Sequence, residues 1–232
     1  MKKRLDISFT RFEIGLWCAS VLAVSLSFVL SPARDPLSLA ASLVGVTALL
    51  LLAKGRVAGQ ILVIVFAVLY GIVSYRVAYY GEMITYLGMS APMALASAIS
   101  WLRHPHGGSH EVAVARLSRR TPLLLSLVTL LVTACFYLIL NMLGTARLGV
   151  STLSVATSFF AASLTFLRSP LYALAYAAND LVLILLWLLA LGSDPASPSM
   201  ILCFLAFLAS DLYGYVSWRR MQARQAGVRS AH

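Results

Sequence analysis

Two aspartates lie inside stretches of the sequence that are long and apolar enough to cross a bilayer. Asp180 stands beside Asn179 near the middle of residues 172–191, and Asp211 lies within residues 199–218. A charged carboxylate at the centre of a membrane costs a few kcal/mol or more, so it persists where it faces a partner or a water-filled cavity. Both aspartates are therefore candidate binding groups.

Aromatic side chains share a helical face with each of these aspartates. At helical spacing the two faces are Tyr172, Tyr176, Asn179, Asp180, Leu183 and Trp187, and Phe204, Phe207, Leu208, Asp211, Tyr215 and Trp218. If the faces meet, they line a pocket in which rings stack on a flat ligand and polar groups bind its hydroxyls or balance a positive charge. The alternative is that the aspartates only lock helices together through Asn or Tyr donors. The cost of a buried carboxylate favours the pocket.

Signatures of catalysis and of metal binding are scarce. The sequence contains no HExxH, GxSxG or P-loop motif, and no dense aspartate cluster that would hold Mg²⁺. Three histidines and Glu111 fall in residues 103–121, but their Gly-rich spacing fixes no ligand geometry and a solvated loop is the favoured interpretation. The three cysteines lie far apart inside apolar runs. We expect no catalytic residue, no metal and no cofactor.

The composition indicates an integral membrane protein. Hydrophobic residues make up 60% of the 232 residues and charged residues only 11%, whereas a soluble domain has about 25% charged residues. The net charge of +10 comes from residues between the apolar runs. This placement is typical of membrane topology rather than of a surface that binds nucleic acid.

Eight apolar windows are long enough to span a hydrocarbon core of about 30 Å. They lie near residues 13–31, 37–53, 59–79, 83–102, 122–143, 150–167, 171–191 and 199–218. The first could imitate a signal peptide, but a retained helix is favoured. Pro92 should kink the fourth span. We predict an all-α integral membrane protein with eight transmembrane helices.

The positive residues predict how the spans are oriented. Lys and Arg accumulate in cytoplasmic segments near helix ends. If both termini are cytoplasmic, 15 of the 18 Lys and Arg residues fall on that side, and Arg34, Arg76 and Arg147 fall on the other. We therefore predict a multi-pass membrane protein with both termini in the cytoplasm.

The two halves of the chain show a weak internal repeat. Spans two to four and six to eight would form equivalent units, each ending in a Ser-Trp pair followed by arginine, at Ser100-Trp101 and Ser217-Trp218. The fifth span would be the linker that keeps the units parallel. The predicted units are residues 1–34 (an amino-terminal tail and extra helix), 35–102 (first three-helix bundle), 103–145 (loop and linker helix), 146–218 (second three-helix bundle) and 219–232 (cytoplasmic tail).

Three segments resemble a known family. They are YRVAYYGEMITYLGMSAPMALASAISWLRHP (75–105), TFLRSPLYALAYAANDLVLILLWLLA (165–190) and SDLYGYVSWRRM (210–221). Their aromatic-Tyr-Gly-acid start, Asn-Asp centre and Asp-x-Tyr-Gly ahead of a terminal Trp resemble the PnuC family of bacterial nicotinamide riboside transporters. The sequence departs from the family pattern at the end of the fourth span, where Trp101 stands alone and His104 follows three residues later.

The resemblance implies a fold and a function. It implies a SWEET-like transporter with two parallel three-helix bundles, a linker helix and an extra first helix, assembled as a homotrimer. It also implies facilitated diffusion of nicotinamide riboside, trapped inside the cell by phosphorylation. The ligand contacts that it implies are Asn179, Asp180, Asp211 and Tyr215, with Tyr176 and Trp187 as stacking rings. Thiamine, riboflavin and other nucleosides remain alternative substrates, and a membrane enzyme or scaffold is the non-transport alternative.

Overall fold

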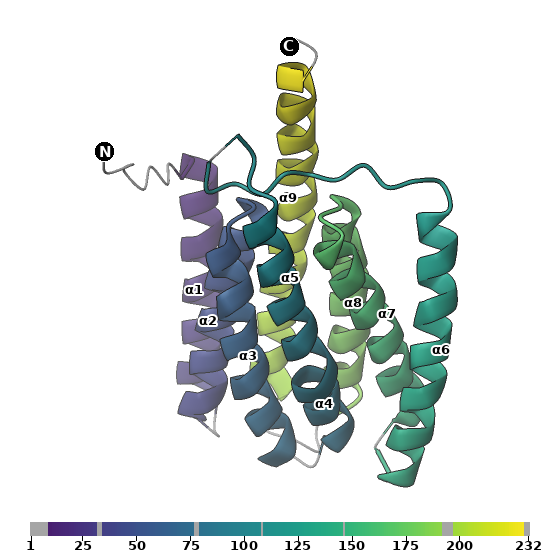
Figure 1. The fold of residues 1–232 in the computed structure, drawn as a ribbon. Coiled ribbons are helices and arrows are strands. Elements are labelled where there is room, and N and C mark those ends of the chain that lie inside the picture. Colours follow the sequence, from purple (N-terminus) through teal and green to yellow (C-terminus); the bar gives the residue numbers. More distant parts are fainter. Residues whose placement is uncertain are drawn as a thin grey trace.

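The computed structural model describes residues 9–31, 34–76, 79–107, 109–145, 147–191 and 197–229, and these residues form long helices without a named strand (Figure 1). Eight helical segments are long and apolar enough to cross a membrane, which confirms the predicted number within the described ranges. The helices are α1 (Arg11–Leu30), α2 (Pro36–Ala53), α3 (Val57–Arg76), α4 (Tyr80–Thr85), η1 (Tyr86–Ser90), α5 (Ala91–Arg103), α6 (Thr121–Met142), α7 (Leu148–Phe166), α8 (Leu171–Leu188) and α9 (Ser197–Arg229).

Local sequence signals explain where several of the helices begin. Thr10 and Glu13 form a capping box at the start of α1, in which each side chain binds the backbone N–H of the other residue. The Asp35 carboxylate caps α2 by accepting from two backbone N–H groups, and Pro36 occupies the first turn, where its missing N–H costs nothing.

The fourth span is a helix interrupted by a wider turn. It runs from Tyr80 to Arg103, and the π-helical turn η1 lies directly ahead of Pro92 in the first turn of α5. Proline has no N–H and its ring crowds the preceding turn, so the regular α-helical hydrogen bonding is disturbed there. Ahead of Pro92 the helix thus forms a π-helical turn, which buries Tyr86 and Met89, and the kink itself stays a prediction.

Six of the membrane-spanning segments close into a ring. The first bundle is α2, α3 and the span α4–η1–α5, and the second is α7, α8 and α9. The bundles meet through α2 against α9 and α5 against α7. The extra helix α1 packs on α2 and α9, while α6 packs on α7 and stands at the edge of the molecule (Figure 1). This confirms the predicted architecture of two parallel three-helix bundles with a linker helix and an extra amino-terminal helix.

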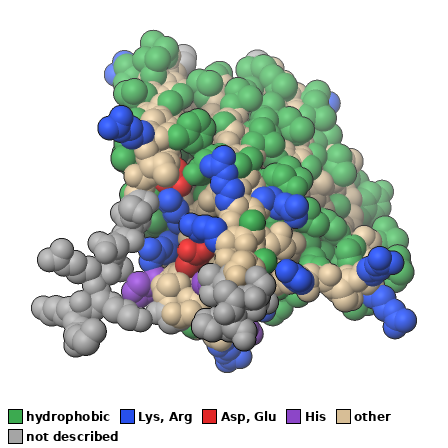
Figure 2. Space-filling model, turned by 90° about the horizontal axis from the view of Figure 1, so that it is seen from above, with side chains coloured by type: hydrophobic (Ala, Val, Ile, Leu, Met, Phe, Trp, Pro, Cys, Tyr) green, Lys and Arg blue, Asp and Glu red, His purple; other side chains and the backbone are tan. Residues whose placement is uncertain are grey.

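The two ends of the molecule differ in composition. Both ends of the described chain and the loop between α5 and α6 lie at one end, which we call the loop side, and the opposite end is the far side (Figure 1). Seen from the loop side, Lys and Arg side chains are spread over this surface and apolar side chains cover the flanks (Figure 2). An apolar belt with charged residues at its end is the surface that a bilayer requires.

The last helix is longer than the sequence predicted. The predicted span ends at residue 218, whereas α9 has 33 residues and continues to Arg229. At about 1.5 Å per residue it is roughly 50 Å long, well beyond a hydrocarbon core of about 30 Å. The extension projects past the other helices on the loop side (Figure 1).

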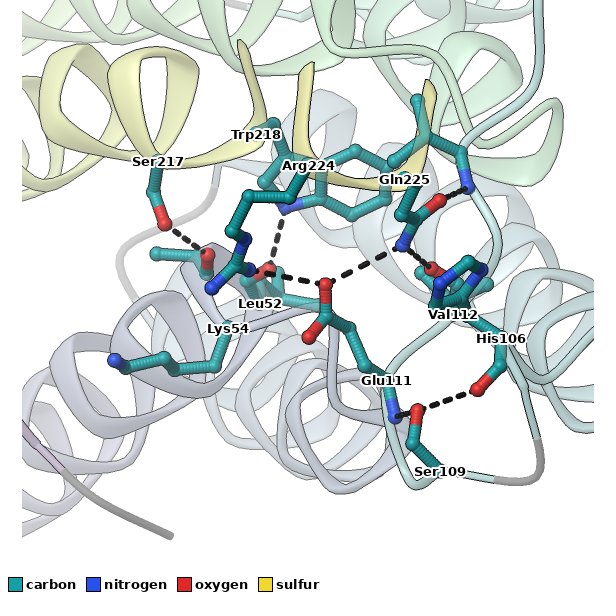
Figure 3. A network of polar contacts seen from close by, with 12 residues as sticks. Leu52, Lys54, His106, Ser109, Glu111, Val112, Ser217, Trp218, Arg224 and Gln225 are labelled. Carbon is teal, nitrogen blue, oxygen red and sulfur yellow. Dashed lines mark hydrogen bonds and ion pairs between the residues drawn. The ribbon is translucent and has the colours of Figure 1, made fainter. Parts of the chain in front are cut away.

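The extension of α9 holds the loop between α5 and α6. Gln225 is buried; its Oε1 accepts from Val114 N at 2.8 Å and its Nε2 donates to Val112 O at 3.0 Å (Figure 3). Arg224 pairs with Glu111 at 3.2 Å. The predicted solvated loop is confirmed at the exposed His104 and His110, but it is wrong at Val112 and Val114, which are buried. Its alternating valines face the helix ends, and burial of these apolar side chains away from water stabilises the folded loop.

Candidate functional site

A cavity of about 60 Å³ lies at the centre of the helix ring. All six spans of the ring contribute to its wall, which consists of Leu49, Leu52, Gln60, Val63, Phe66, Tyr86, Ser90, Ser158, Thr165, Tyr176, Asn179, Asp180, Phe207 and Asp211. Pockets for drug-sized ligands hold about 300 Å³ or more. The helices therefore have to separate before a ligand of that size fits, and this structure is a contracted state of the site.

Asp180 and Asp211 come together in this cavity from α8 and α9. Both are at least 96% buried, and their carboxyl groups lie within hydrogen-bonding reach of each other. Asp180 Oδ2 has no hydrogen-bond partner among the described residues. Two carboxylates at such a distance repel each other in a low dielectric unless a proton or a cation lies between them. The pair is thus suited to receive a positively charged group.

Asn179 is held in a fixed orientation beside the carboxylates. The hydroxyls of Thr157 and Ser158 on α7 donate to Asn179 Oδ1 at 2.8 and 2.9 Å. Buried amides that are hydrogen-bonded in this way rigidify a site, because moving them away from the hydroxyls would break both bonds in a low dielectric. Asn179 therefore presents a defined edge of its amide to the cavity.

The other residues predicted from the sequence fall in three different places. Tyr176 lines the cavity together with Asn179 and the two aspartates. Trp187 lies farther along α8, fully buried, and its Nε1 donates to Tyr70 Oη at 3.2 Å. Tyr215 packs on the loop-side cluster around Trp218. In this conformation neither Trp187 nor Tyr215 lines the cavity, and ligand contact by any of these residues stays a prediction.

Aromatic rings close the cavity toward the far side. Tyr70 and Tyr86 lie 4.4 Å apart between ring centroids, and Phe66 lies 5.5 Å from Tyr70 and 5.8 Å from Tyr86. Phe204 and Phe207 add edge-on contacts to the same layer. We call these five rings the aromatic layer. The aromatic layer closes the cavity toward the far side almost entirely by packing of its rings.

Hydrogen bonds close the cavity toward the loop side. Trp101 Nε1 donates to Thr165 O at 3.0 Å, and Ser100 Oγ donates to Phe166 O at 3.0 Å. In the other half of the molecule, Trp218 Nε1 donates to Leu52 O at 2.8 Å and Ser217 Oγ donates to Ala53 O at 2.7 Å. Each Ser-Trp pair thus binds two consecutive carbonyls at the end of the first helix of the other bundle. We call these two sets of bonds the Ser-Trp latches.

The repeat seen in the sequence corresponds to two equivalent sets of contacts in the structure. Ser100-Trp101 and Ser217-Trp218 occupy equivalent positions at the ends of the third spans, as the repeat predicted. Their indole rings also meet, with centroids 5.3 Å apart. The two bundles are therefore joined on the loop side by contacts that obey the same internal symmetry.

Two polar residues of the pathway were missed by the sequence analysis. Gln60 lines the cavity, is 2% exposed, and its Nε2 has no hydrogen-bond partner among the described residues. Glu82, also 2% exposed, lies one turn before Tyr86 on the far side of the aromatic layer. Gln60 lies within a predicted span and could have been found by listing every amide and carboxylate there, because burial of such groups is costly. Glu82 lies just before the predicted span 83–102, so the same list would have missed it.

The described residues contain no group of three or more His, Cys, Asp or Glu side chains that could hold a metal ion. The loop histidines and Glu111 in particular are not gathered around one point. Glu111 instead serves the contacts to Arg224 and Gln225 (Figure 3).

Comparison with known proteins identifies the family of this chain. A family model described as nicotinamide mononucleotide transporter matches residues 35–220, which is most of the chain. The chain belongs to this family. The match covers both three-helix bundles and the linker helix, and therefore every residue of the cavity wall.

Members of the family with curated names are similar over almost their full length. A nicotinamide riboside transporter PnuC of Neisseria mucosa is 26% identical over 232 residues, covering 97% of this chain and 88% of that protein. The protein of the same name from Haemophilus influenzae is 24% identical over 227 residues, covering 97% and 96%.

A solved structure supports the fold. The crystal structure of the vitamin B3 transporter PnuC superposes with a TM-score of 0.82, at 24% identity, over 94% of each chain. The helix ring described above is thus the fold of that structure. Together with the family match and the eight apolar helices, the chain is a multi-pass membrane transporter.

Proposed function

We propose that this protein transports nicotinamide riboside into the cell. The family model is named for nicotinamide mononucleotide and the two relatives for nicotinamide riboside, and these compounds differ by one phosphate group. The charge of the cavity wall favours the riboside.

The charged groups of the cavity support the riboside over the mononucleotide. Asp180 and Asp211 are there, and none of the described residues that line it is Lys or Arg. A phosphate buried beside two carboxylates without a counter-charge would be strongly disfavoured. A pyridinium ring needs an anionic partner and ring contacts, which Asp180, Asp211 and Tyr176 offer. The ribose hydroxyls find acceptors and donors in Asn179, Gln60 and Thr165.

We propose that transport is facilitated diffusion by rocking of the two bundles. The cavity lies at the interface of the two parallel bundles, which is where repeat-built transporters bind their substrates. Alternate opening of the Ser-Trp latches and of the aromatic layer would expose the cavity to one side at a time. Phosphorylation of the riboside inside the cell would trap it, because the product no longer suits the acidic cavity. These features favour a transporter over an enzyme.

We place the loop side in the cytoplasm. Among the described residues this side holds Lys54, Arg103 and the arginines of the loop and of the α9 extension, whereas Arg76 and Arg147 lie on the far side. The excess of positive residues near helix ends supports this orientation. Both termini would then be cytoplasmic in a bacterial inner membrane.

Thiamine is the second candidate substrate. It is also a cation with a flat ring, so the carboxylate pair and Tyr176 would suit it as well. Riboflavin and uncharged nucleosides fit less well, because they leave the two buried carboxylates without a counter-charge. A panel of ligands in a thermal-shift assay separates these substrates, and we expect the largest shift with nicotinamide riboside.

Uptake of labelled nicotinamide riboside into proteoliposomes tests the proposed transport. We expect saturable uptake that stops when inside and outside concentrations are equal and that is not accelerated by an imposed proton gradient. Accumulation driven by a proton gradient would contradict facilitated diffusion and would make Asp180 or Asp211 a proton carrier. Absence of uptake would contradict the proposed substrate.

We also propose that the protein is a homotrimer in the lipid bilayer, as the resemblance to the family implies. The exposed apolar faces of α6 are compatible with a protein neighbour. Native mass spectrometry in a mild detergent measures this directly, and a single monomeric species would contradict it.

A further inference from the structure

Glu82 is a buried carboxylate that the account of the central cavity does not use. It is the third residue of α4, its side chain is 2% exposed, and neither of its carboxylate oxygens has a hydrogen-bond partner among the described residues. The ion pairs of the described chain involve Glu13, Asp35 and Glu111 instead. A group with this much desolvation cost and no compensating contact is expected to have its partner in another state of the protein.

The surroundings of Glu82 are polar but unpaired. Ser154 of α7 faces the carboxyl group without a hydrogen bond of ordinary geometry, and its hydroxyl is buried and unpartnered. The Ser74 hydroxyl on α3 lies beside Tyr70, which itself lies close to Glu82, and it is also buried without an ordinary hydrogen-bond partner among the described residues. These groups come from three different spans of the ring, and none of them is a cation.

The aromatic layer separates Glu82 from the central carboxylates. Tyr86 lies one turn after Glu82 and reaches the cavity, and its ring packs on Tyr70. Glu82 thus lies just beyond the layer on the far side, while Asp180 and Asp211 lie just within it. Glu82 and Asp180 both lie close to Tyr86, whose ring packs on Tyr70, so these tyrosines stand between the outer carboxylate and the central pair.

We propose that Glu82, with Ser154 and Ser74, forms an outer binding station for the positively charged ring of the substrate. The station becomes accessible when α4 and η1 move away from α3 and α7. A π-helical turn allows such a movement, since its hydrogen bonds are already irregular. The incoming cation supplies the counter-charge that Glu82 lacks, and Tyr70 and Tyr86 offer ring faces as it passes to the cavity. This inference rests on the proposed transport of a cationic nucleoside.

The test compares Glu82→Gln with the wild-type protein in right-side-out membrane vesicles. Glutamine keeps the shape of the side chain and removes the charge. Asp35→Asn is the matched control, because it removes a carboxylate at the same end of the molecule, outside the pathway, and asparagine still caps α2. Glu82→Asp retains the charge and shows whether activity follows charge or shape. Thermal unfolding in detergent shows that each variant is folded.

We expect the concentration of nicotinamide riboside at half-maximal uptake to rise about tenfold in Glu82→Gln, which corresponds to about 1.4 kcal/mol. It should change less than twofold in Asp35→Asn and less than threefold in Glu82→Asp. Inhibition by the uncharged dihydronicotinamide riboside should be equal in wild type and Glu82→Gln, because this compound has no charge for Glu82 to bind.

Three results would overturn the inference. Unchanged half-maximal uptake in Glu82→Gln shows that the carboxyl group serves only the fold. An equal loss for the charged and the uncharged riboside shows a steric role rather than binding of a cation. If the wild-type protein itself takes up no nicotinamide riboside, the proposed function fails and the outer station fails with it, so the two failures are told apart by the wild-type measurement.

Discussion

The two ends of the transport pathway are closed in different ways. On the loop side, four side-chain donors from Ser100, Trp101, Ser217 and Trp218 each bind a backbone carbonyl of the opposite bundle. On the far side, rings of the aromatic layer pack against one another, and the neighbouring Glu82 oxygens and Ser154 hydroxyl have no partner among the described residues.

This difference indicates which end opens more readily. A net hydrogen bond contributes about 1 kcal/mol, and a donor or acceptor left unpaired in a buried place costs about 1–3 kcal/mol. Opening the latches therefore loses satisfied contacts, whereas opening the far side lets water or a ligand reach groups that are now unpaired. From this balance of polar contacts, we expect the far side to open more readily than the loop side, although the packed rings oppose this opening.

Removal of the two indole bonds of the latches should give the largest effect. In the double variant Trp101→Phe and Trp218→Phe, the rings remain but both indole donors are lost, which removes about 2 kcal/mol of loop-side closure. A cysteine placed at Gln60, in a background without the native cysteines, should then react about thirtyfold faster with an impermeant maleimide in inside-out vesicles.

The matched control for this experiment is Trp187→Phe. It removes the far-side indole bond to Tyr70 and leaves the latches intact, so labelling from the loop side should not change. Labelling of the double variant at the wild-type rate would contradict the assignment of the latches as the closing contacts of this side.

A smaller effect should distinguish paired from unpaired hydroxyls. Ser100→Ala removes a bound donor and should lower the free energy of unfolding by about 1 kcal/mol. Ser154→Ala removes a buried hydroxyl without a partner among the described residues and should leave stability unchanged or raise it slightly. Chemical denaturation in detergent measures the free energy of unfolding of both variants. An equal decrease in the two variants would contradict the difference that we infer between the loop side and the far side.

The sequence predicted those features that depend on the cost of polar groups in a membrane. Asp180 and Asp211 were identified from this cost, and the structure brings them to one cavity. The number of spans and the parallel bundles followed from apolar windows and the Ser-Trp repeat. These signals are strong because a bilayer leaves few alternatives for an apolar segment of about 20 residues.

The depth of residues along a helix could not be predicted in the same way. Trp187 and Tyr215 share a helical face with Asp180 and Asp211, but they lie about two turns and one turn farther along, beyond the cavity. Periodicity gives the direction of a side chain and not which neighbour meets it. Glu82 was overlooked because it lies between the predicted spans 59–79 and 83–102, and a carboxylate is ordinary in a segment between spans.

The α9 extension escaped prediction for another reason. Residues after Trp218 are polar, so they carry no membrane signal, and their helical state depends on contacts such as Gln225 with Val112 and Val114. The loop was likewise read as solvated because its valines find their partners only in the folded molecule. The α9 extension and the loop both depend on contacts between segments that are distant in the sequence, and such contacts cannot be predicted from a local sequence pattern.

The central claim is that the cavity binds a cationic riboside through Asp180 and Asp211 and rejects its phosphorylated form. Isothermal titration calorimetry of the purified protein with nicotinamide riboside and with nicotinamide mononucleotide tests it most directly. We expect the riboside to bind at least tenfold more tightly, and the variant Asp211→Asn to lose most of that difference. Equal or tighter binding of the mononucleotide to the wild-type protein would contradict the account.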